Sequence, residues 1–306
     1  MKLFFELLRV KQWVKNAFVI LPFIFSRKWL LLLDYYQNPK SVPFSDAIAP
    51  LFYTLITVIS FCSVASGIYI LNDWVDCEQD KIHPKKKFRP IPSGQISTHK
   101  AFTVMVCLWI GGFLLIFSQV PSGQTTLVLL AYLILNISYS LKLKQMVILD
   151  VMCIALGFVL RVLAGATAIH VLPSFWLLLC TSTLALFLGF CKRRHECMLF
   201  SDQKIEHRQV LEHYSLQFLD QMISVVTTST LIFYVLYTLD SETQKIHHTQ
   251  LHWTIPFVIY GIFRYLFLVY HCEEGGSPTD ILYSDPGIIV AGALWILCVC
   301  FLLIFT

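Results

Sequence analysis

Long apolar blocks separated by short polar segments run along the 306-residue chain. Most blocks approach the ~20 residues that an α-helix needs to cross the hydrocarbon core of a bilayer. The pattern predicts nine membrane-spanning helices, near residues 12–33, 48–71, 101–120, 124–141, 147–169, 173–191, 216–239, 253–270 and 287–305. Arg27 and Lys28 interrupt the first block, which favours a tilted or partly interfacial helix there.

Composition supports a membrane protein and excludes a soluble globular one. Hydrophobic residues make up 57% of the chain and charged residues 14%, whereas soluble domains have about 45–50% apolar and about 25% charged residues. No composition break marks a second domain, and no polar segment is long enough to fold alone. We therefore expect one all-α integral membrane bundle over residues 1–306. The formal charge of +4 is too small, and the basic residues too interrupted by apolar blocks, to predict a nucleic-acid partner.

The distribution of Lys and Arg predicts the orientation, because cytoplasmic loops carry an excess of both. With a cytoplasmic N-terminus and nine spans, 17 of the 23 basic residues fall on the cytoplasmic side and four on the other. The other two, Arg161 and Arg264, fall within predicted spans. We expect a multi-pass protein of the cell (inner or plasma) membrane, with its polar site facing the cytoplasm.

The densest polar motif follows the second predicted span and contains Asn72, Asp73, Asp76 and Asp80. In a continuous helix, Asp76 lies about 60° and Asp80 about 20° from Asp73 around the axis, so the three carboxylates share one face. Like charges on one face repel each other, and a divalent cation between them relieves the repulsion. The motif predicts a site for a metal and a diphosphate. The alternative is a solvated, charged helix end.

A basic, proline-containing segment comes next, with Lys85, Lys86, Lys87 and Arg89. Arg grips phosphate in a bidentate manner and Lys acts as a point charge, so this segment suits a polyanionic ligand. For Lys85 and Lys87, attraction to anionic lipid is an equally good interpretation.

Two further predicted helix ends carry cations on the same side. Tyr139 and Lys144 end the fourth span, and the run Lys192-Arg193-Arg194 ends the sixth. Such residues commonly extend toward the membrane interface. Three consecutive cations point in several directions around a helix, however, so at least one of them should face the bundle.

Arg161 lies deep within the fifth predicted span, roughly 16 Å along the helix from Asp150. A charge at that depth must face a partner or a wet cavity, which makes Arg161 a candidate functional residue. A charge-paired structural arginine is the alternative. Arg264 raises the same question.

In their order along the chain, these motifs resemble those of the UbiA superfamily of intramembrane prenyl-group enzymes. The matching motifs are Asn72-Asp73-x-x-Asp76-x-x-x-Asp80, His83-Pro84-x-Lys86-x-x-Arg89-Pro90 and Tyr139-Ser140-x-x-Leu143-Lys144. Other motifs resemble the decaprenyl-phosphate phosphoribosyltransferase branch: Arg9-Val-Lys-Gln12-Trp13-Val-Lys15-Asn16, Leu-Gly-Phe-Val-Leu-Arg161, Lys192-Arg193-Arg194-x-Glu196 and Thr254-Ile-Pro256 through Arg264-Tyr265. The resemblance covers essentially the whole chain.

The resemblance implies transfer of 5-phosphoribose from 5-phosphoribosyl 1-diphosphate (PRPP) to a decaprenyl-type polyprenyl phosphate, with release of diphosphate. It implies that Asp73, Asp76 and Asp80 are the catalytic carboxylates and hold Mg²⁺ on the donor. The implied substrate-binding residues are Asn72, Lys15, Lys86, Arg89, Tyr139, Lys144, Arg161, Lys192, Arg193 and Arg194.

Two alternatives stay open. The first is a UbiA-type enzyme that moves a prenyl group from a prenyl diphosphate to an aromatic acceptor. Those relatives carry a second aspartate-rich motif where this chain has Lys192-Arg193-Arg194, and the cations favour direct contact with phosphate instead. The second is a transporter of a phosphorylated lipid, whose binding site is expected near the membrane midplane rather than at one face. A homo-oligomer is compatible with each of these functions.

Overall fold

Helices are the regular elements of the computed structural model, which describes residues 2–40, 42–82, 86–202, 209–240, 250–271 and 278–305. In these ranges, eight helical segments are long and apolar enough to cross a membrane, which agrees with the predicted all-α membrane bundle. They are α4 (Phe44–Val75), α6 (Thr98–Gln119), α7 (Gly123–Leu141), α8 (Leu149–Ala168), α9 (Phe175–Asp202), α10 (Leu216–Leu239), η5 (Leu251–Thr254) with α12 (Ile255–His271), and α14 (Pro286–Phe305).

The first predicted span is a broken one. The segment is divided into η1 (Val10–Val19), α2 (Leu21–Phe25) and α3 (Leu30–Gln37), with a bend of 50° between the part that ends at Phe25 and α3. Arg27 lies in the break with a positive φ of 57°, a conformation that cannot continue a right-handed helix. If this bent pair crosses the membrane as one span, the total is nine.

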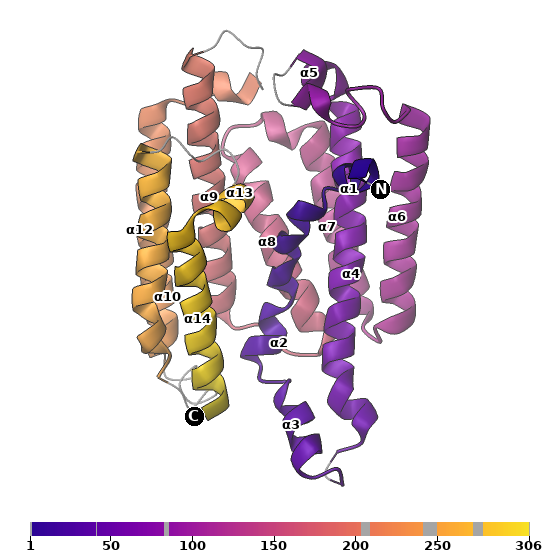
Figure 1. Cartoon of the computed structure of the whole chain (residues 1–306), viewed down its shortest axis with the longest axis vertical. Helices are drawn as coiled ribbons and strands as arrows, with labels where there is room; N and C mark the ends of the chain where they lie inside the picture. Colours follow the sequence, from indigo (N-terminus) through magenta and orange to yellow (C-terminus); the bar gives the residue numbers. More distant parts are fainter. Residues whose placement is uncertain are drawn as a thin grey trace. The chain divides into compact units, whose positions relative to one another are not determined.

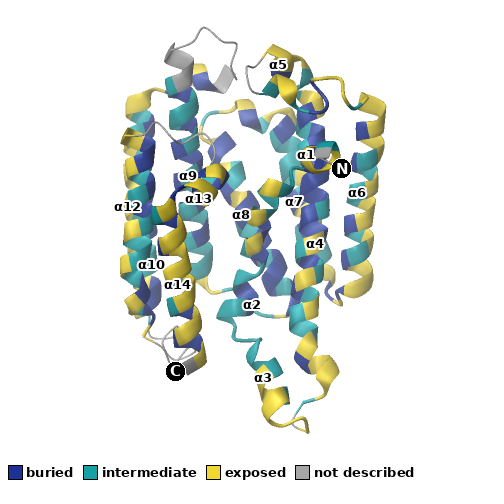
Figure 2. Cartoon of the chain, in the orientation of Figure 1, coloured by how far each residue is buried: buried dark blue, intermediate teal, exposed yellow. Residues whose placement is uncertain are grey.

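The chain forms two compact units, Met1–Pro173 and Ser174–Thr306. In the first, α4 is the central helix and packs against α6, α7, α8 and η1 (Figure 1). Short elements complete this unit: α1 (Lys2–Leu8), α5 (Cys77–Ile82), η2 (Lys86–Phe88) and η3 (Leu143–Gln145). Many positions of α4 are buried (Figure 2), as its apolar and small residues predict.

Small residues allow close helix packing in the first unit. A Cβ atom on Gly165 of α8 would lie 1.9 Å from the carbonyl oxygen of Val19, so only glycine lets η1 approach α8 this closely. Close approach at small residues is a general means of helix association in membranes.

In the second unit, α10 packs against α9, and α12 packs against α14. The indole Nε1 of Trp295 donates to the Tyr234 hydroxyl at 2.7 Å, and that hydroxyl lies 2.6 Å from Oγ1 of Thr254. This network joins α14, α10 and η5. The remaining elements are η4 (Gln209–His213) and α13 (Pro278–Ser284).

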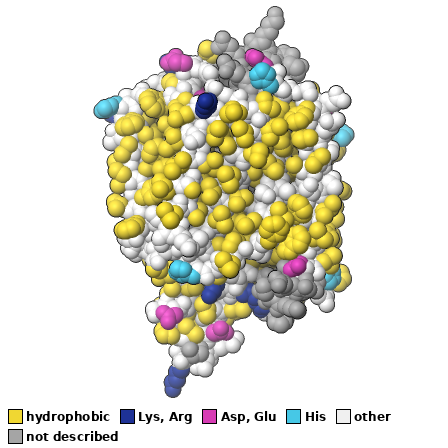
Figure 3. Space-filling view, turned by 180° about the vertical axis from the view of Figure 1, so that it is seen from behind, with side chains coloured by type: hydrophobic (Ala, Val, Ile, Leu, Met, Phe, Trp, Pro, Cys, Tyr) yellow, Lys and Arg dark blue, Asp and Glu magenta, His cyan; other side chains and the backbone are white. Residues whose placement is uncertain are grey.

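Hydrophobic side chains cover most of the face that Figure 3 shows, and charged side chains lie near its two ends. This distribution is the one that a bilayer favours, because hydrocarbon solvates apolar side chains and excludes charges.

Candidate functional site

Asp73, in the last turn of α4, is the most enclosed of the three predicted metal ligands, with 1% of its surface exposed. Its Oδ1 atom accepts hydrogen bonds from two guanidinium groups, those of Arg9 and Arg89. The Arg89 bond, from Nη1, measures 3.0 Å. Two cations therefore compensate this buried carboxylate.

Asp80 lies in α5 and is 3% exposed. Its Oδ2 atom accepts a hydrogen bond of 2.5 Å from the same Arg89 Nη1 that contacts Asp73. The Nζ of Lys86 lies 3.8 Å from the other oxygen, Oδ1. Burial and then the neighbouring Arg9 lower the pKa of the Arg89 guanidinium, while Asp73 and Asp80 act in the opposite direction.

Asp76 does not share the contacts of Asp73 and Asp80. The continuous helix assumed for residues 73–80 is wrong, because α4 ends at Val75 and α5 begins at Cys77. Asp76 lies between them with φ −91° and ψ 8°, and its carboxylate pairs with Lys144 of η3. Lys144 is 5% exposed, so this is a largely buried ion pair. The break turns Asp76 toward a cation of its own.

The three carboxylates therefore form two arrangements rather than one cluster. Among the described residues, no group of three or more Asp, Glu, His or Cys side chains is close enough to hold a metal. The pair formed by Asp73 and Asp80 does fit a divalent cation, because one oxygen of each already contacts a single positively charged nitrogen. Mg²⁺ typically takes one or two protein carboxylates and completes its octahedron with water and phosphate oxygens.

Arg9 is a site residue that sequence reasoning did not single out. It has a positive φ of 50°, and its guanidinium carbon lies 5.1 Å from the centre of the Tyr69 ring. The adjoining backbone is held to α4, since the Ser66 hydroxyl donates to the Leu8 carbonyl at 2.9 Å. The only sequence signal was its position in the basic motif that ends at Asn16.

Arg161 is buried, with 5% of its surface exposed, and it contacts neutral partners. Nε donates to Oδ1 of Asn16 at 2.8 Å, Nη1 to the Gly157 carbonyl at 2.8 Å and Nη2 to the Tyr132 hydroxyl at 2.7 Å. Each guanidinium nitrogen thus has an acceptor, and none of these three acceptors is a carboxylate. Lys15 is half-buried and lies within electrostatic range of Arg161 and Arg9.

The remaining predicted residues of the first unit lie at helix ends. Asn72 and Tyr139 are half-buried, in the last turns of α4 and α7. The Asn72 carbonyl accepts the backbone N–H of Asp76, the residue that caps α4, at 3.0 Å. His83, Pro84 and Lys85 lie outside the described residues.

The predicted basic cluster of the second unit lies on α9. Arg193 is fully buried and pairs with Glu196, whose other oxygen lies 3.8 Å from Nζ of Lys192. Arg194 Nε donates to Oδ1 of Asp220 at 2.6 Å, and the Tyr270 hydroxyl donates to the same oxygen at 2.9 Å. Asp220 and Tyr270 were not predicted, because they come from α10 and α12.

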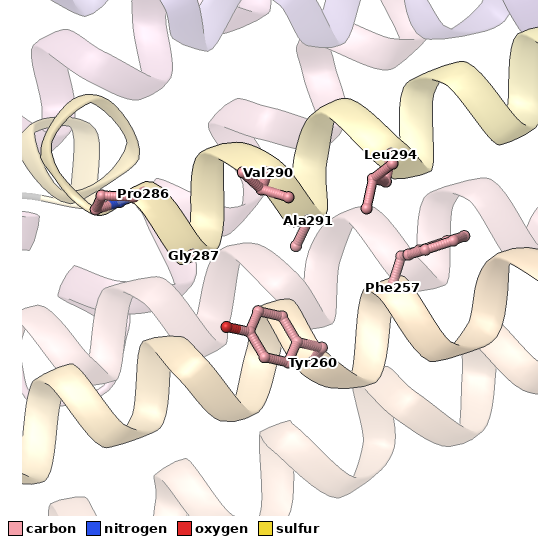
Figure 4. A pocket seen from close by; sticks show the side chains of 7 residues that line it. All are labelled: Phe257, Tyr260, Pro286, Gly287, Val290, Ala291 and Leu294. Carbon is pink, nitrogen blue, oxygen red and sulfur yellow. The ribbon is translucent and has the colours of Figure 1, made fainter.

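Arg264, the second arginine within a predicted span, pairs with a carboxylate. Its Nη2 lies 2.8 Å from Oδ2 of Asp285, and its Nε lies 3.2 Å from Oδ1. The Arg264 hydrogen bond holds the pKa of Asp285 below its usual value, against the effect of burial. Pro286, the residue after Asp285, belongs to the lining of an apolar groove (Figure 4), which is formed by Phe257, Tyr260, Pro286, Gly287, Val290, Ala291 and Leu294.

The long apolar helices indicate a multi-pass membrane protein. The buried ion pairs at helix ends indicate where its polar chemistry lies. Residues 42–205, more than half of the chain, match the UbiA prenyltransferase family, so the chain belongs to that family and is a transferase.

The comparisons with individual proteins agree. The chain is 29% identical to the decaprenyl-phosphate phosphoribosyltransferase of Corynebacterium glutamicum over 297 residues, which cover 95% of this chain and 84% of that protein. It is 27% identical to the protein of the same name from Mycolicibacterium smegmatis, with 94% and 88% covered. In fold it is similar to a UbiA homologue from Archaeoglobus fulgidus bound to GPP and Mg²⁺, with a TM-score of 0.71, 18% identity and 98% and 99% of the two chains covered.

Proposed function

We propose that this protein transfers 5-phosphoribose from PRPP to a polyprenyl phosphate of the decaprenyl type and releases diphosphate, at the cytoplasmic face of a cell membrane. The observation that carries the proposal is the arrangement of buried carboxylates and cations around Asp73 and Asp80. It offers two carboxylates for a metal beside several groups that bind phosphate. The names of the relatives from Corynebacterium and Mycolicibacterium support this donor and acceptor.

In the proposed reaction, the bond between the anomeric carbon of ribose and the diphosphate oxygen breaks, and the diphosphate leaves with the bonding electrons. An oxygen of the polyprenyl phosphate forms the new bond to that carbon. The acceptor is already ionised, so the reaction needs no strong general base. Attack from the side opposite the leaving group inverts the anomeric centre.

Asp73 and Asp80 would hold Mg²⁺, and Asp76 is proposed as a third ligand. Bound there, Mg²⁺ would supply charge stabilisation for the leaving diphosphate. Arg89 and Lys86, with Lys144, are proposed to bind donor phosphate oxygens, and Asn72 and Tyr139 to orient the donor. The other proposed phosphate ligands are Lys15, Arg161, Lys192, Arg193 and Arg194.

Arg193 and Arg194 supply the feature that favours a phosphorylated sugar over a prenyl diphosphate as donor. A second acidic motif at this position would suit another metal, whereas guanidinium groups bind phosphate directly. The proposal therefore places the 5-phosphate or the acceptor phosphate with cations rather than with a metal.

The experiment is a transfer assay with purified protein in detergent, Mg²⁺, polyprenyl phosphate and PRPP, followed by mass spectrometry of the lipid. We expect a lipid-linked phosphoribose in the presence of Mg²⁺ and none after chelation. Asp73→Ala should abolish turnover, and Arg194→Ala should weaken the use of donor or acceptor. The exposed Lys81→Ala is the matched control and should leave turnover unchanged. Absence of the lipid product with the wild-type protein would refute the proposal.

A further inference from the structure

Arg89 occupies the position that a divalent cation would need. A single nitrogen, Nη1, lies 3.0 Å from Asp73 Oδ1 and 2.5 Å from Asp80 Oδ2. A metal ion bound by both carboxylates must lie close to both of these oxygens. The guanidinium and the ion therefore cannot use the same two oxygen atoms together.

The charges around the pair lead to the same conclusion. Arg9, Arg89 and Lys86 contact the two carboxylates, so the positive charges already outnumber the negative ones. A divalent cation added to this group would increase the excess in a largely buried site, where like charges interact strongly. The ion binds favourably only if a resident cation moves away or an anion arrives with it.

Of the two arginines, Arg89 is the one that can exchange. Arg9 lies beside the Tyr69 ring, on a backbone tied to α4 through Ser66. The Arg89 side chain makes no cation–π contact within the described part of the chain, and at 27% it is only slightly more exposed than that of Arg9, at 22%. Its backbone precedes the buried Pro90, Ile91 and Pro92. A rotation of the side chain alone therefore removes Nη1 from both carboxylates, while Arg9 stays on Asp73 and Lys86 stays near Asp80.

We propose that Arg89 competes with the divalent cation for Asp73 and Asp80. When the cation binds, the Arg89 side chain leaves the two carboxylates and contacts the diphosphate. The second half of this exchange rests on the proposed function, because it needs a diphosphate ligand. The first half concerns the metal and the two carboxylates only. Competition by Arg89 makes metal binding weak in the absence of substrate, and metal binding becomes stronger when an anion draws Arg89 away.

The first half can be tested without any substrate. Binding of Mn²⁺ alone to the purified full chain is measured from the electron paramagnetic resonance signal of free Mn²⁺. Arg89→Ala removes the competing guanidinium, and we expect its Mn²⁺ dissociation constant to fall by about tenfold, since the ion no longer displaces a charge-assisted hydrogen bond. Adding Asp80→Ala to Arg89→Ala should abolish this gain, because the second carboxylate is lost.

Lys81→Ala is the matched control for the loss of one positive charge in the same segment. Lys81 is exposed and pairs with Glu78 at 2.7 Å, so its removal should change Mn²⁺ affinity by less than about twofold. The competition is refuted if Arg89→Ala binds Mn²⁺ no more tightly than wild type, or if Lys81→Ala gains as much. A failed transfer assay would instead refute the proposed reaction and leave the Mn²⁺ result intact.

Discussion

Nε of Arg161 donates a hydrogen bond of 2.8 Å to Oδ1 of Asn16, which joins two residues 145 positions apart in the chain. Both side chains are buried, so the bond fixes η1 against α8 at a depth where water cannot replace it.

Asn16→Ala removes this acceptor and leaves the buried Arg161 Nε without a partner. We expect the free energy of unfolding to fall by about 1–3 kcal/mol. The midpoint of thermal unfolding in mild detergent measures the change. Asn136→Ala is the control, because the side-chain hydrogen bond of Asn136 goes to the carbonyl of Tyr132 in its own helix. Equal midpoints for the two variants would contradict the bridging role of Asn16.

Gly165→Ala should be among the most damaging single substitutions in the first unit. The added methyl group would lie 1.9 Å from the Val19 carbonyl oxygen, and that backbone must move apart to accept it. We expect loss of a monodisperse peak in size-exclusion chromatography, or a large fall in the unfolding midpoint.

Gly111→Ala is the matched control for this substitution, since nothing lies within 4 Å of its added methyl group. Alanine also favours a helix over glycine by about 0.5–1 kcal/mol. Gly111→Ala should therefore be neutral or slightly stabilising. If Gly165→Ala behaved in the same way, the close approach of η1 and α8 would be wrong.

The ion pair of Lys144 and Asp76 predicts a strong coupling between two single substitutions. Lys144→Met leaves the Asp76 carboxylate without this partner in a largely buried site. Loss of one partner should cost several kcal/mol, and loss of both should cost less than the two single changes together. A double-mutant cycle with Asp76→Asn, read from unfolding midpoints, measures the coupling. Additive effects would refute the pair.

The pair of Arg264 and Asp285 predicts acid sensitivity. Because the folded-state pKa of Asp285 lies below its unfolded value, ionised Asp285 stabilises the fold fully above the unfolded pKa, about 3.9. This contribution is lost as the pH falls from about 4 through the lowered folded-state pKa. Unfolding midpoints measured between neutral pH and about pH 3 should fall less steeply for Asp285→Asn than for wild type. Parallel curves would contradict this assignment.

The sequence predicted the spans well, because a bilayer demands long apolar helices and the blocks are unmistakable. Which charges carry the site stays a prediction. The sequence did not predict the helix break at Asp76, because residues 73–80 contain no Pro or Gly that would mark the end of a helix. The sequence also did not predict ion-pair partners such as Arg9 for Asp73 or Asp220 for Arg194. These partners come from distant segments that only packing brings together. The cytoplasmic orientation and the single domain over residues 1–306 stay predictions.

The central claim is that ribose, and not a prenyl group, is transferred. The most direct measurement uses PRPP with ¹⁴C in the ribose and ³²P in the terminal phosphate of the diphosphate, together with polyprenyl phosphate, Mg²⁺ and the purified protein. After extraction, ¹⁴C should enter the lipid phase and ³²P should stay in the water phase as diphosphate. Retention of both labels in water, together with transfer of a prenyl group from a labelled prenyl diphosphate to an aromatic acceptor, would contradict the account.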